Sequence, residues 1–529
     1  MDVIFVPLAS VAGASLDQVK LISCLLISYP LGSLFIRIPA SHPHLKHLFN
    51  LAITLFYLIP VLNMYSAFLQ LLGSAVGTYL IAAFVKGPNM PWIVFGFTMG
   101  HLFINHIIRA WYNLSYETFE ITGPQMVLTM KLSTFAWNVW DGRRAAADLD
   151  KWQTEKRIAK YPSFLEFLGF AFYFPGFLVG PYLDFASYMS LIDESIYSGA
   201  ATTKKGRKVP KGRKRVAYRK MVTGLGFLAL FVTMSGSWNF GVAIQDWFRE
   251  RSWLYRVAYF QVCGVIERSK YYAIWTLTEG ASILTGLGFA GYSPSGASLW
   301  TGAANVDFMN IEFAPNFKVL LDSWNMKTNI WLRECVYKRV TPQGQKPGFK
   351  SSMLTFATSA HGVAGGYYMT FLLGGFMTTV SRHARSTLRP LALANPVLRP
   401  IYGAFGTLFT VTALNFICAP FMLLTVRDSL LAWHVLGWYG FVIIFGGLGF
   451  FYSPVGLWAK AQSAHLAKDA KVGVQERRGT SGLKTEMPAS GLQANGIGSA
   501  TLTPTTPGVI PPFNSAAKEW EKMMAAQTS

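Results

Sequence analysis

Long apolar segments constrain the fold of this chain more than any other feature of its sequence. A run of about 18 or more apolar residues can cross a hydrocarbon layer of roughly 30 Å as a helix. The clearest runs extend from Val19 to Ile38, from His47 to Val85, which is long enough for two helices, and from Pro91 to Tyr112. Because 52% of the 529 residues are hydrophobic and only 14% are charged, the composition is more apolar than that of an ordinary soluble domain. The sequence therefore predicts an all-α, polytopic integral membrane protein.

Later apolar segments are interrupted by more polar residues. They span Phe164 to Tyr188, Met221 to Met234, Tyr255 to Phe289, Met353 to Val380, Ile401 to Leu424 and Leu430 to Phe451. Together with the first runs, they predict about ten to twelve transmembrane or re-entrant helices. The N-terminal residues lack the basic region and cleavage site of a secretory signal, so we expect the first long helix to stay in the membrane.

Charged residues are distributed unevenly along the chain. The formal net charge is +21, and the segment Lys204 to Lys220 contains ten Lys or Arg residues and no acidic residue. Such a loop beside membrane helices favours the cytoplasmic side and contacts anionic headgroups, an interpretation that we prefer to nucleic-acid binding. From about Ala464 a Gly-, Ser-, Thr- and Pro-rich sequence follows that cannot bury a core. We predict a membrane domain over 1–460, with a basic cytosolic loop at 200–220, and a polar, disordered cytosolic tail over 461–529.

His361 is the strongest polar candidate within an apolar segment, where polar side chains are costly and often functional. No acidic or basic residue lies within ten positions of it. A neutral imidazole can accept a proton from an alcohol and so act as a general base. The glycines that follow, Gly362, Gly365 and Gly366, allow a backbone or a ligand to approach closely. A histidine that is hydrogen-bonded between packed helices explains the pattern equally well.

The stretch Leu320 to Val340 predicts a single amphipathic helix. At 100° per residue, Asn325, Asn329 and Arg333 share a polar stripe. The opposite, packing side holds Trp324, Thr328, Trp331 and Cys335. An amide can donate to a developing oxyanion or orient a hydroxyl group. A capping or interhelical amide is the alternative.

Other polar residues are weaker candidates. Glu334 and Lys338, four positions apart, predict a surface ion pair, and Glu279 in an apolar setting predicts either a substrate contact or a helix-packing hydrogen bond. His101 and His106 are five positions apart, a poor spacing for ligands on one helical face, so we expect no metal site. The four cysteines lie far apart and fit neither a disulfide framework nor a zinc site. We interpret them as packed thiols; they are Cys24, Cys263, Cys335 and Cys418.

Two segments together, "WNMKTNIWLRECVYKR" and "AHGVAGGY", resemble the paired signature of the membrane-bound O-acyltransferase (MBOAT) family. In its lysophospholipid acyltransferases, an asparagine in a W/F-N-x-x-T-N-x-W stretch precedes a W-H-G-x-x-x-G-Y stretch. Asn325 and His361 are 36 residues apart, a spacing similar to that of the family's pair. "KYYAIWTLTEGASILTGLGFAGY" and "NVDFMNIEFAPNFKVLLDSWN" resemble the fungal broad-specificity enzymes, so the resemblance covers roughly Phe49 to Phe451. One residue departs from the pattern: Ala360 stands where the family has Trp.

The resemblance implies an MBOAT-type helical chamber in the endoplasmic reticulum membrane. Acyl-CoA would enter as a co-substrate from the cytosol, a lysophospholipid would arrive laterally, and no bound cofactor would be needed. His361 would act as general base and Asn325 would orient or stabilise the reacting oxygens. Lys338 and Arg339 would contact CoA phosphates or anchor the helix on the cytosolic side. The full set of candidate substrate contacts is Trp324, Asn329, Arg333, Lys338, Arg339, Gly362, Gly366, Tyr367 and Glu279.

Several functional alternatives stay open at this stage. An enzyme of the same family could acylate another acceptor, such as a sterol, a diacylglycerol or a protein hydroxyl. A non-catalytic lipid-binding scaffold is suggested by Ala360, and a transporter could also carry histidines and broken helices. The sequence does not determine headgroup preference, acyl-chain preference or oligomeric state, a homo-oligomer among the options.

Overall fold

The computed structural model describes residues 1–112, 118–198, 209–341, 345, 348–360 and 364–466. These residues form helices joined by turns and loops, and within them the only β-pairing is an isolated bridge between Tyr292 and Ser298. The predicted all-α fold is confirmed.

Six helices in the described ranges are long and apolar enough to span a membrane. They are α2 (Leu16–Phe35), α3 (Pro43–Phe56) continued by the π-helix η1 (Tyr57–Val61), α4 (Tyr65–Phe84), α5 (Met90–Trp111), α10 (Arg213–Met234) and α18 (Leu398–Leu423). Large apolar side chains on them face outward: Leu69, Ile104 and Leu408 are 66%, 54% and 62% exposed. Such exposure suits contact with lipid and not with water.

One further helix pair, bent by 83° at its break, has the length and apolar composition of a broken span or a re-entrant loop. It combines α19 (Val426–Val435) with the continuous run of α20 (Tyr439–Phe441), η7 (Val442–Gly446) and α21 (Gly447–Tyr452). Three further long helices carry more polar and ionisable residues: α6 (Thr122–Gly142), α12 (Trp253–Thr285) and α17 (Gly365–Ala394). The sequence predicted ten to twelve membrane segments, and that number counts these three helices as well. Among the described residues, six helices, or seven spans with the bent pair, meet the criterion of length and apolar composition.

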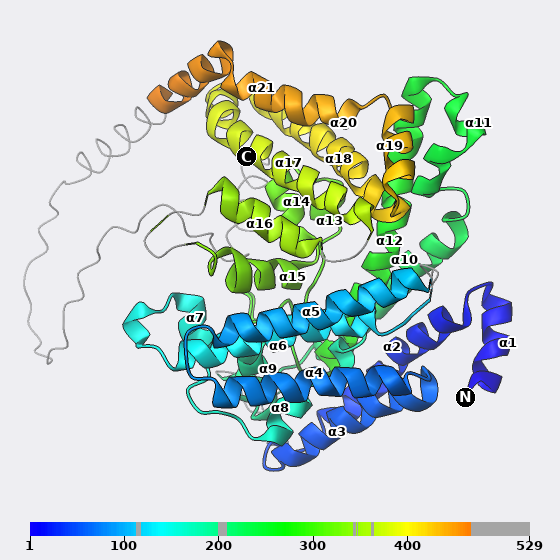
Figure 1. The fold of residues 1–529 in the computed structure, drawn as a ribbon, viewed down its shortest axis with the longest axis vertical. Coiled ribbons are helices and arrows are strands. Elements are labelled where there is room, and N and C mark those ends of the chain that lie inside the picture. Colours follow the sequence, from blue (N-terminus) through cyan, green and yellow to red (C-terminus); the bar gives the residue numbers. More distant parts are fainter. Residues whose placement is uncertain (113–117, 199–208, 342–344, 346–347, 361–363, 467–529) are drawn as a thin grey trace, which may run out of the picture. The chain divides into compact units, whose positions relative to one another are not determined.

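Several long helices run side by side (Figure 1): α4 with α5 and α6, α10 with α12, and α17 with α18. Shorter elements connect them. These are α1 (Asp2–Ala12), η2 (Ala146–Asp148), α7 (Lys151–Lys156), η4 (Ser195–Tyr197), η5 (Phe240–Ile244), α11 (Asp246–Arg249), α13 (Met309–Glu312), α14 (Phe317–Ser323), α15 (Met326–Trp331), η6 (Leu332–Tyr337) and α16 (Phe349–Ser359).

The expected apolar segment from Phe164 to Tyr188 is not a single helix. It contains α8 (Phe164–Ala171), a 3-10 turn, η3 (Phe174–Gly176), and the start of α9 (Phe185–Ile192). Pro175 and Pro181 explain the interruption, because proline lacks the N–H that a continuing helix requires.

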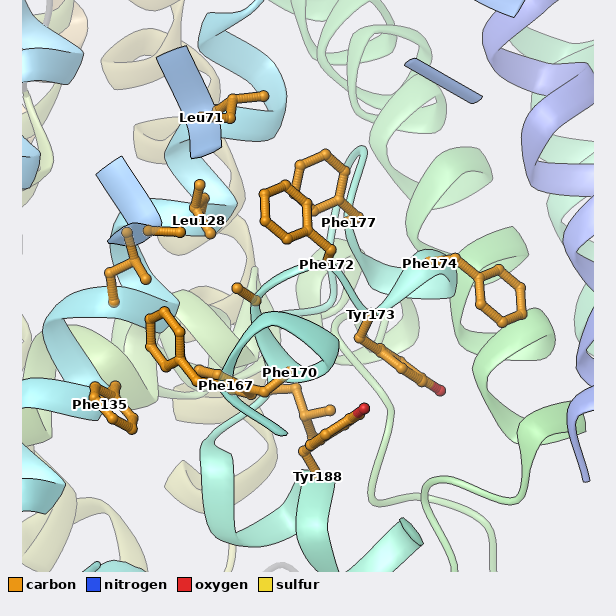
Figure 2. Close-up of a cluster of buried hydrophobic side chains, with 14 of the residues drawn as sticks. Leu71, Leu128, Phe135, Phe167, Phe170, Phe172, Tyr173, Phe174, Phe177 and Tyr188 are labelled. Atoms are coloured by element: carbon orange, nitrogen blue, oxygen red, sulfur yellow. The ribbon is translucent and has the colours of Figure 1, made fainter. Parts of the chain in front are cut away.

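This interrupted segment supplies the aromatic core shown in Figure 2. Phe167 of α8 packs against Phe135 of α6, with ring centroids 4.7 Å apart. The Tyr173 hydroxyl forms a 2.6 Å hydrogen bond with Thr285 Oγ1 at the end of α12. The core therefore connects α8 to α6, and Tyr173 connects the same segment to α12. Both α6 and α12 contact the candidate site.

Two boundaries differ from the sequence prediction. The second half of the basic segment, Arg213 to Lys220, forms the first turns of α10 and not a loop, while 199–208 lie outside the described residues. Helical structure also continues over 454–466, past the predicted domain end at 460. The remainder of the predicted tail, 467–529, lies outside the described residues.

Candidate active site

The segment that carries Asn325 is a broken helix. The prediction of one helix from Leu320 to Val340 is wrong, because α14 ends at Ser323, Trp324 is extended and α15 begins at Met326. Asn325 adopts a left-handed conformation with φ +42°, which asparagine tolerates better than most residues. Asn325 therefore lies at the break and not on a continuous stripe with Asn329 and Arg333.

The Asn325 side chain accepts two hydrogen bonds on its oxygen. Asn305 Nδ2 donates to Asn325 Oδ1 at 3.2 Å, and Thr328 Oγ1 donates to the same atom at 2.9 Å. Asn305 also accepts the backbone N–H groups of Met326, at 2.8 Å on its carbonyl, and Lys327, at 3.0 Å on Oδ1. These bonds hold the start of α15 in place.

Three of the four residues on the predicted packing side lie against α6. Trp331 Nε1 donates to Ser133 Oγ at 2.8 Å. Thr328 Oγ1 lies 3.3 Å from the Met130 sulfur, and the Cys335 thiol lies 3.4 Å from Thr134 Oγ1. The fourth residue, Trp324, points elsewhere because of the break in the helix: its ring packs edge-on against α12, with centroid distances of 5.0 Å to Trp275 and 5.4 Å to Tyr271.

Asn329 and Arg333 make local contacts. Asn329 Nδ2 donates to the Leu321 carbonyl at 3.1 Å, which ties α15 back to α14 across the break. Arg333 Nε pairs with Glu334 Oε1 at 2.8 Å. Glu334 also pairs with Lys338 at 2.6 Å, but its side chain is 2% exposed. The predicted pair is present, and the prediction that it lies on the surface is wrong.

Lys338 and Arg339 both face carboxylates of the α6–α7 region. Arg339 binds Asp141 through two nitrogens, at 2.9 and 2.5 Å, and its guanidinium lies 4.3 Å from the centroid of the Trp137 ring. Lys338 Nζ lies 2.7 Å from Asp150 Oδ2. Although burial alone would raise it, the pKa of Asp150 is lowered by hydrogen bonds from Lys338 and from the backbone. Both cations therefore have protein partners and hold η6 against the rest of the molecule.

Glu279 lies between two long helices. Its side chain is 1% exposed, and its carboxylate pairs with Lys220 Nζ of α10 at 2.9 Å. This contact corresponds to the helix-packing alternative.

The histidine segment is described only at its flanks, since His361 and Gly362 lie outside the described residues. Ala360, directly after α16, is 1% exposed. Gly366 at the start of α17 donates its N–H to the Leu424 carbonyl at 2.9 Å, and a Cβ there would lie 2.0 Å from the Pro420 carbonyl oxygen. The Tyr367 ring packs on Phe421 with centroids 4.8 Å apart. Gly366 is thus required for the close approach of α17 to the end of α18.

Two described elements that flank the asparagine and histidine segments, α16 and η6, contact each other. The helix α16, which ends two residues before His361, packs against η6, and Thr341 Oγ1 bonds Ser351 Oγ at 3.2 Å. The helix that precedes His361, α16, therefore packs on η6, which continues the helix α15 that begins after Asn325.

The remaining sequence candidates have structural partners. His101 Nδ1 lies 2.7 Å from Ser74 Oγ across α4 and α5. No group of three or more His, Cys, Asp or Glu side chains is arranged to hold a metal ion within the described ranges. All four cysteines are free thiols; three are buried and Cys418 is partly exposed.

The sequence did not indicate Asn305, because its contact with Asn325 exists only in the folded chain.

Comparison with known proteins gives consistent results. The family model described as "MBOAT, membrane-bound O-acyltransferase family" matches residues 107–423. A lysophospholipid acyltransferase of Schizosaccharomyces pombe is 37% identical over 462 residues, which cover 86% of this chain and 90% of the relative. One of Saccharomyces cerevisiae is 37% identical over 456 residues, covering 82% and 73%. The human membrane-bound glycerophospholipid O-acyltransferase 1 is 29% identical over 452 residues, covering 83% and 89%. Because the family model matches more than half of the chain and two relatives are 37% identical over most of its length, this chain belongs to the membrane-bound O-acyltransferase family.

Proposed function

We propose that this protein is a lysophospholipid acyltransferase that moves a fatty acyl group from acyl-CoA to the free sn-2 hydroxyl of a lysophospholipid. The observation that carries the proposal is 37% identity, over most of both chains, to two fungal proteins named lysophospholipid acyltransferase. The membrane-capable helices support a lipid acceptor, because the hydroxyl can then reach the site from the bilayer.

The chemistry needs few catalytic groups because an acyl-CoA thioester is already activated. His361 removes the proton from the sn-2 hydroxyl, and the oxygen attacks the thioester carbonyl carbon. The C–S bond breaks, coenzyme A leaves as the thiol after it takes up that proton, and the new ester stays on the lipid. Asn325 orients or stabilises the reacting oxygens. No covalent acyl-enzyme is required.

The candidate substrate contacts divide according to their partners. Asn329, Lys338 and Arg339 are engaged within the protein, which favours a structural role over contact with CoA phosphates. The basic start of α10 favours the cytosolic side, where acyl-CoA would enter. The endoplasmic reticulum membrane is the compartment that suits this phospholipid chemistry.

The test uses purified full-length protein in detergent with oleoyl-CoA and a panel of lysophospholipids. Free CoA thiol and diacyl product are measured together, and equal amounts of both are expected. Asn325→Asp keeps both accepted hydrogen bonds but removes the amide donor, so we expect kcat to fall by about 10²–10³. His361→Ala should abolish the formation of diacyl product. Asn310 is exposed, and Asn310→Ala serves as the matched control.

Each contrary outcome would indicate a different function for this protein. Product formed only with a sterol, diacylglycerol or peptide would identify another acceptor. Well-folded protein that binds lysolipid but releases no CoA with any acceptor would be a scaffold, and Ala360→Trp would then be the first reversion. Lipid uptake into vesicles without CoA release would indicate a transporter.

A further inference from the structure

The turn at Asn325 is held by a single buried residue of another loop, through both its backbone and its side chain. Asn305, 2% exposed, accepts the Met326 N–H on its backbone carbonyl and the Lys327 N–H on its side-chain oxygen. These are the first two N–H groups of α15, which has no side-chain cap of its own. Asn305 therefore does from 20 residues away what an N-cap side chain normally does locally.

This contact determines the orientation of both amides. A backbone N–H can only donate, so the Asn305 atom that faces Lys327 at 3.0 Å must be the oxygen. The other end of the Asn305 amide is then its NH₂ group, which can also only donate. The Asn325 atom that faces it at 3.2 Å is accordingly Oδ1. Thr328 Oγ1 donates to the same oxygen at 2.9 Å.

With its oxygen engaged twice, Asn325 has one polar group left for a substrate. Both side-chain hydrogen bonds of Asn325 within the described residues fall on Oδ1, and none involves Nδ2. Two donors on the carbonyl oxygen polarise the amide and strengthen its N–H groups as donors. The amide is therefore prepared to donate to a developing negative oxygen and not to accept a proton.

Resting on the proposed function, we propose that Asn305 is a positioning residue for acyl transfer. Together with Thr328 it fixes the Asn325 amide so that Nδ2 is presented as a hydrogen-bond donor to the oxyanion formed from the thioester carbonyl. Asn305 itself does not contact the substrate. Its effect on turnover passes through Asn325 alone.

The first test replaces the donor on Asn305 without changing its shape. In Asn305→Asp, one carboxylate oxygen still accepts the Lys327 N–H, but the other cannot donate to Asn325 Oδ1. The Asn325 amide then turns its NH₂ group toward the new carboxylate and loses it for the substrate. We expect kcat to fall by about 10- to 100-fold, with KM for acyl-CoA and lysophospholipid within about twofold.

Thr328 gives an independent pair of variants, of which one keeps the shape of the side chain and the other keeps its hydroxyl group. Thr328→Val removes the second donor and should lower kcat, whereas Thr328→Ser retains the hydroxyl and should restore it. This pair decides the inference even if Asn305→Asp fails to fold, as judged by size-exclusion chromatography and thermal unfolding.

A double-variant cycle separates positioning from a general structural role. If Asn305 and Thr328 act through Asn325, adding Thr328→Val to Asn325→Asp gives no further loss of kcat; multiplied losses would overturn the inference. Loss in Asn325→Asp with wild-type kcat in both Asn305→Asp and Thr328→Val would overturn the inference and leave the proposed function intact. Wild-type turnover in Asn325→Asp, or no CoA release by the wild-type protein, would remove the proposed role of Asn325 and the inference together.

Discussion

Asn325 combines two properties that few side chains share. It tolerates a left-handed backbone, φ +42°, and it carries a neutral N–H donor. Alanine at this position would lose the donor and also add backbone strain of about 1 kcal/mol, so its effect would mix the two causes. Aspartate tolerates the same conformation, keeps an accepting oxygen and replaces the N–H donor with a carboxylate oxygen, so its effect reports on the side chain and not on the backbone.

Cys335 is the cysteine nearest in sequence to Asn325, but its environment argues against a nucleophilic role. Burial raises the pKa of its thiol to about 12, so the thiol stays protonated at neutral pH and is unreactive. We predict that Cys335→Ala keeps turnover close to that of the wild type. Native protein treated with N-ethylmaleimide should show no label at Cys335 by mass spectrometry, and unfolded protein should show it. An acyl group trapped on Cys335 would instead indicate a covalent mechanism.

At the scale of elements, α12 organises the side of the site that faces Trp324. Its Arg268 forms two hydrogen bonds with Glu312 of α13, at 2.8 and 2.6 Å, and a third with Asn415 of α18. Tyr272, also on α12, donates to the same Glu312 at 2.6 Å and packs against Trp324. This buried network therefore joins three helices and reaches the residue before Asn325.

We predict that Glu312→Gln destabilises the protein strongly. Arg268 is 8% exposed and would keep its charge without a charged partner, which costs about 3–5 kcal/mol at buried sites. The measurement is the apparent Tm in detergent. The control, Asp322→Asn, breaks the exposed pair with Lys318 and should cost less than about 1 kcal/mol. Equal shifts in both variants would contradict a stabilising role for the network.

The contact between α17 and the end of α18 depends on Gly366. A Cβ at this position would lie 2.0 Å from the Pro420 carbonyl oxygen, a distance that backbone atoms can relieve only by moving apart. We predict that Gly366→Ala lowers stability by about 1–3 kcal/mol and reduces turnover, since α17 starts four residues after His361. Gly403→Ala is the matched control, because a Cβ at Gly403 meets nothing within 4 Å. Unchanged thermal unfolding in Gly366→Ala would contradict this packing argument.

For the whole molecule, the family match over 107–423 does not extend to the polar C-terminal sequence. Its Gly, Ser, Thr and Pro content cannot bury a core. We predict that a chain ending after residue 466, where the described helical structure stops, releases CoA at the wild-type rate per mole of protein. A large fall in rate, with normal extraction and thermal unfolding, would assign the tail a role in catalysis.

The amino-acid sequence alone was sufficient to predict the all-α membrane fold, and it carries the motifs from which the Asn325–His361 pair is proposed. Apolar length is a local property, since each span satisfies its own backbone hydrogen bonds, and the signature residues lie in short continuous motifs. It was also sufficient to identify the packing side formed by Thr328, Trp331 and Cys335, because that periodicity survives within the short helices.

Only the tertiary structure decided how those motifs are held. Periodicity predicted one helix over Leu320 to Val340, but Asn305 binds the N–H groups that follow Asn325 and stabilises a left-handed turn that breaks it. Tertiary ion pairs likewise engaged Glu279, Lys338 and Arg339 with partners far away in the sequence. Hydrogen bonds of this kind depend on which buried donor meets which acceptor after folding, and local sequence patterns carry no information about that pairing.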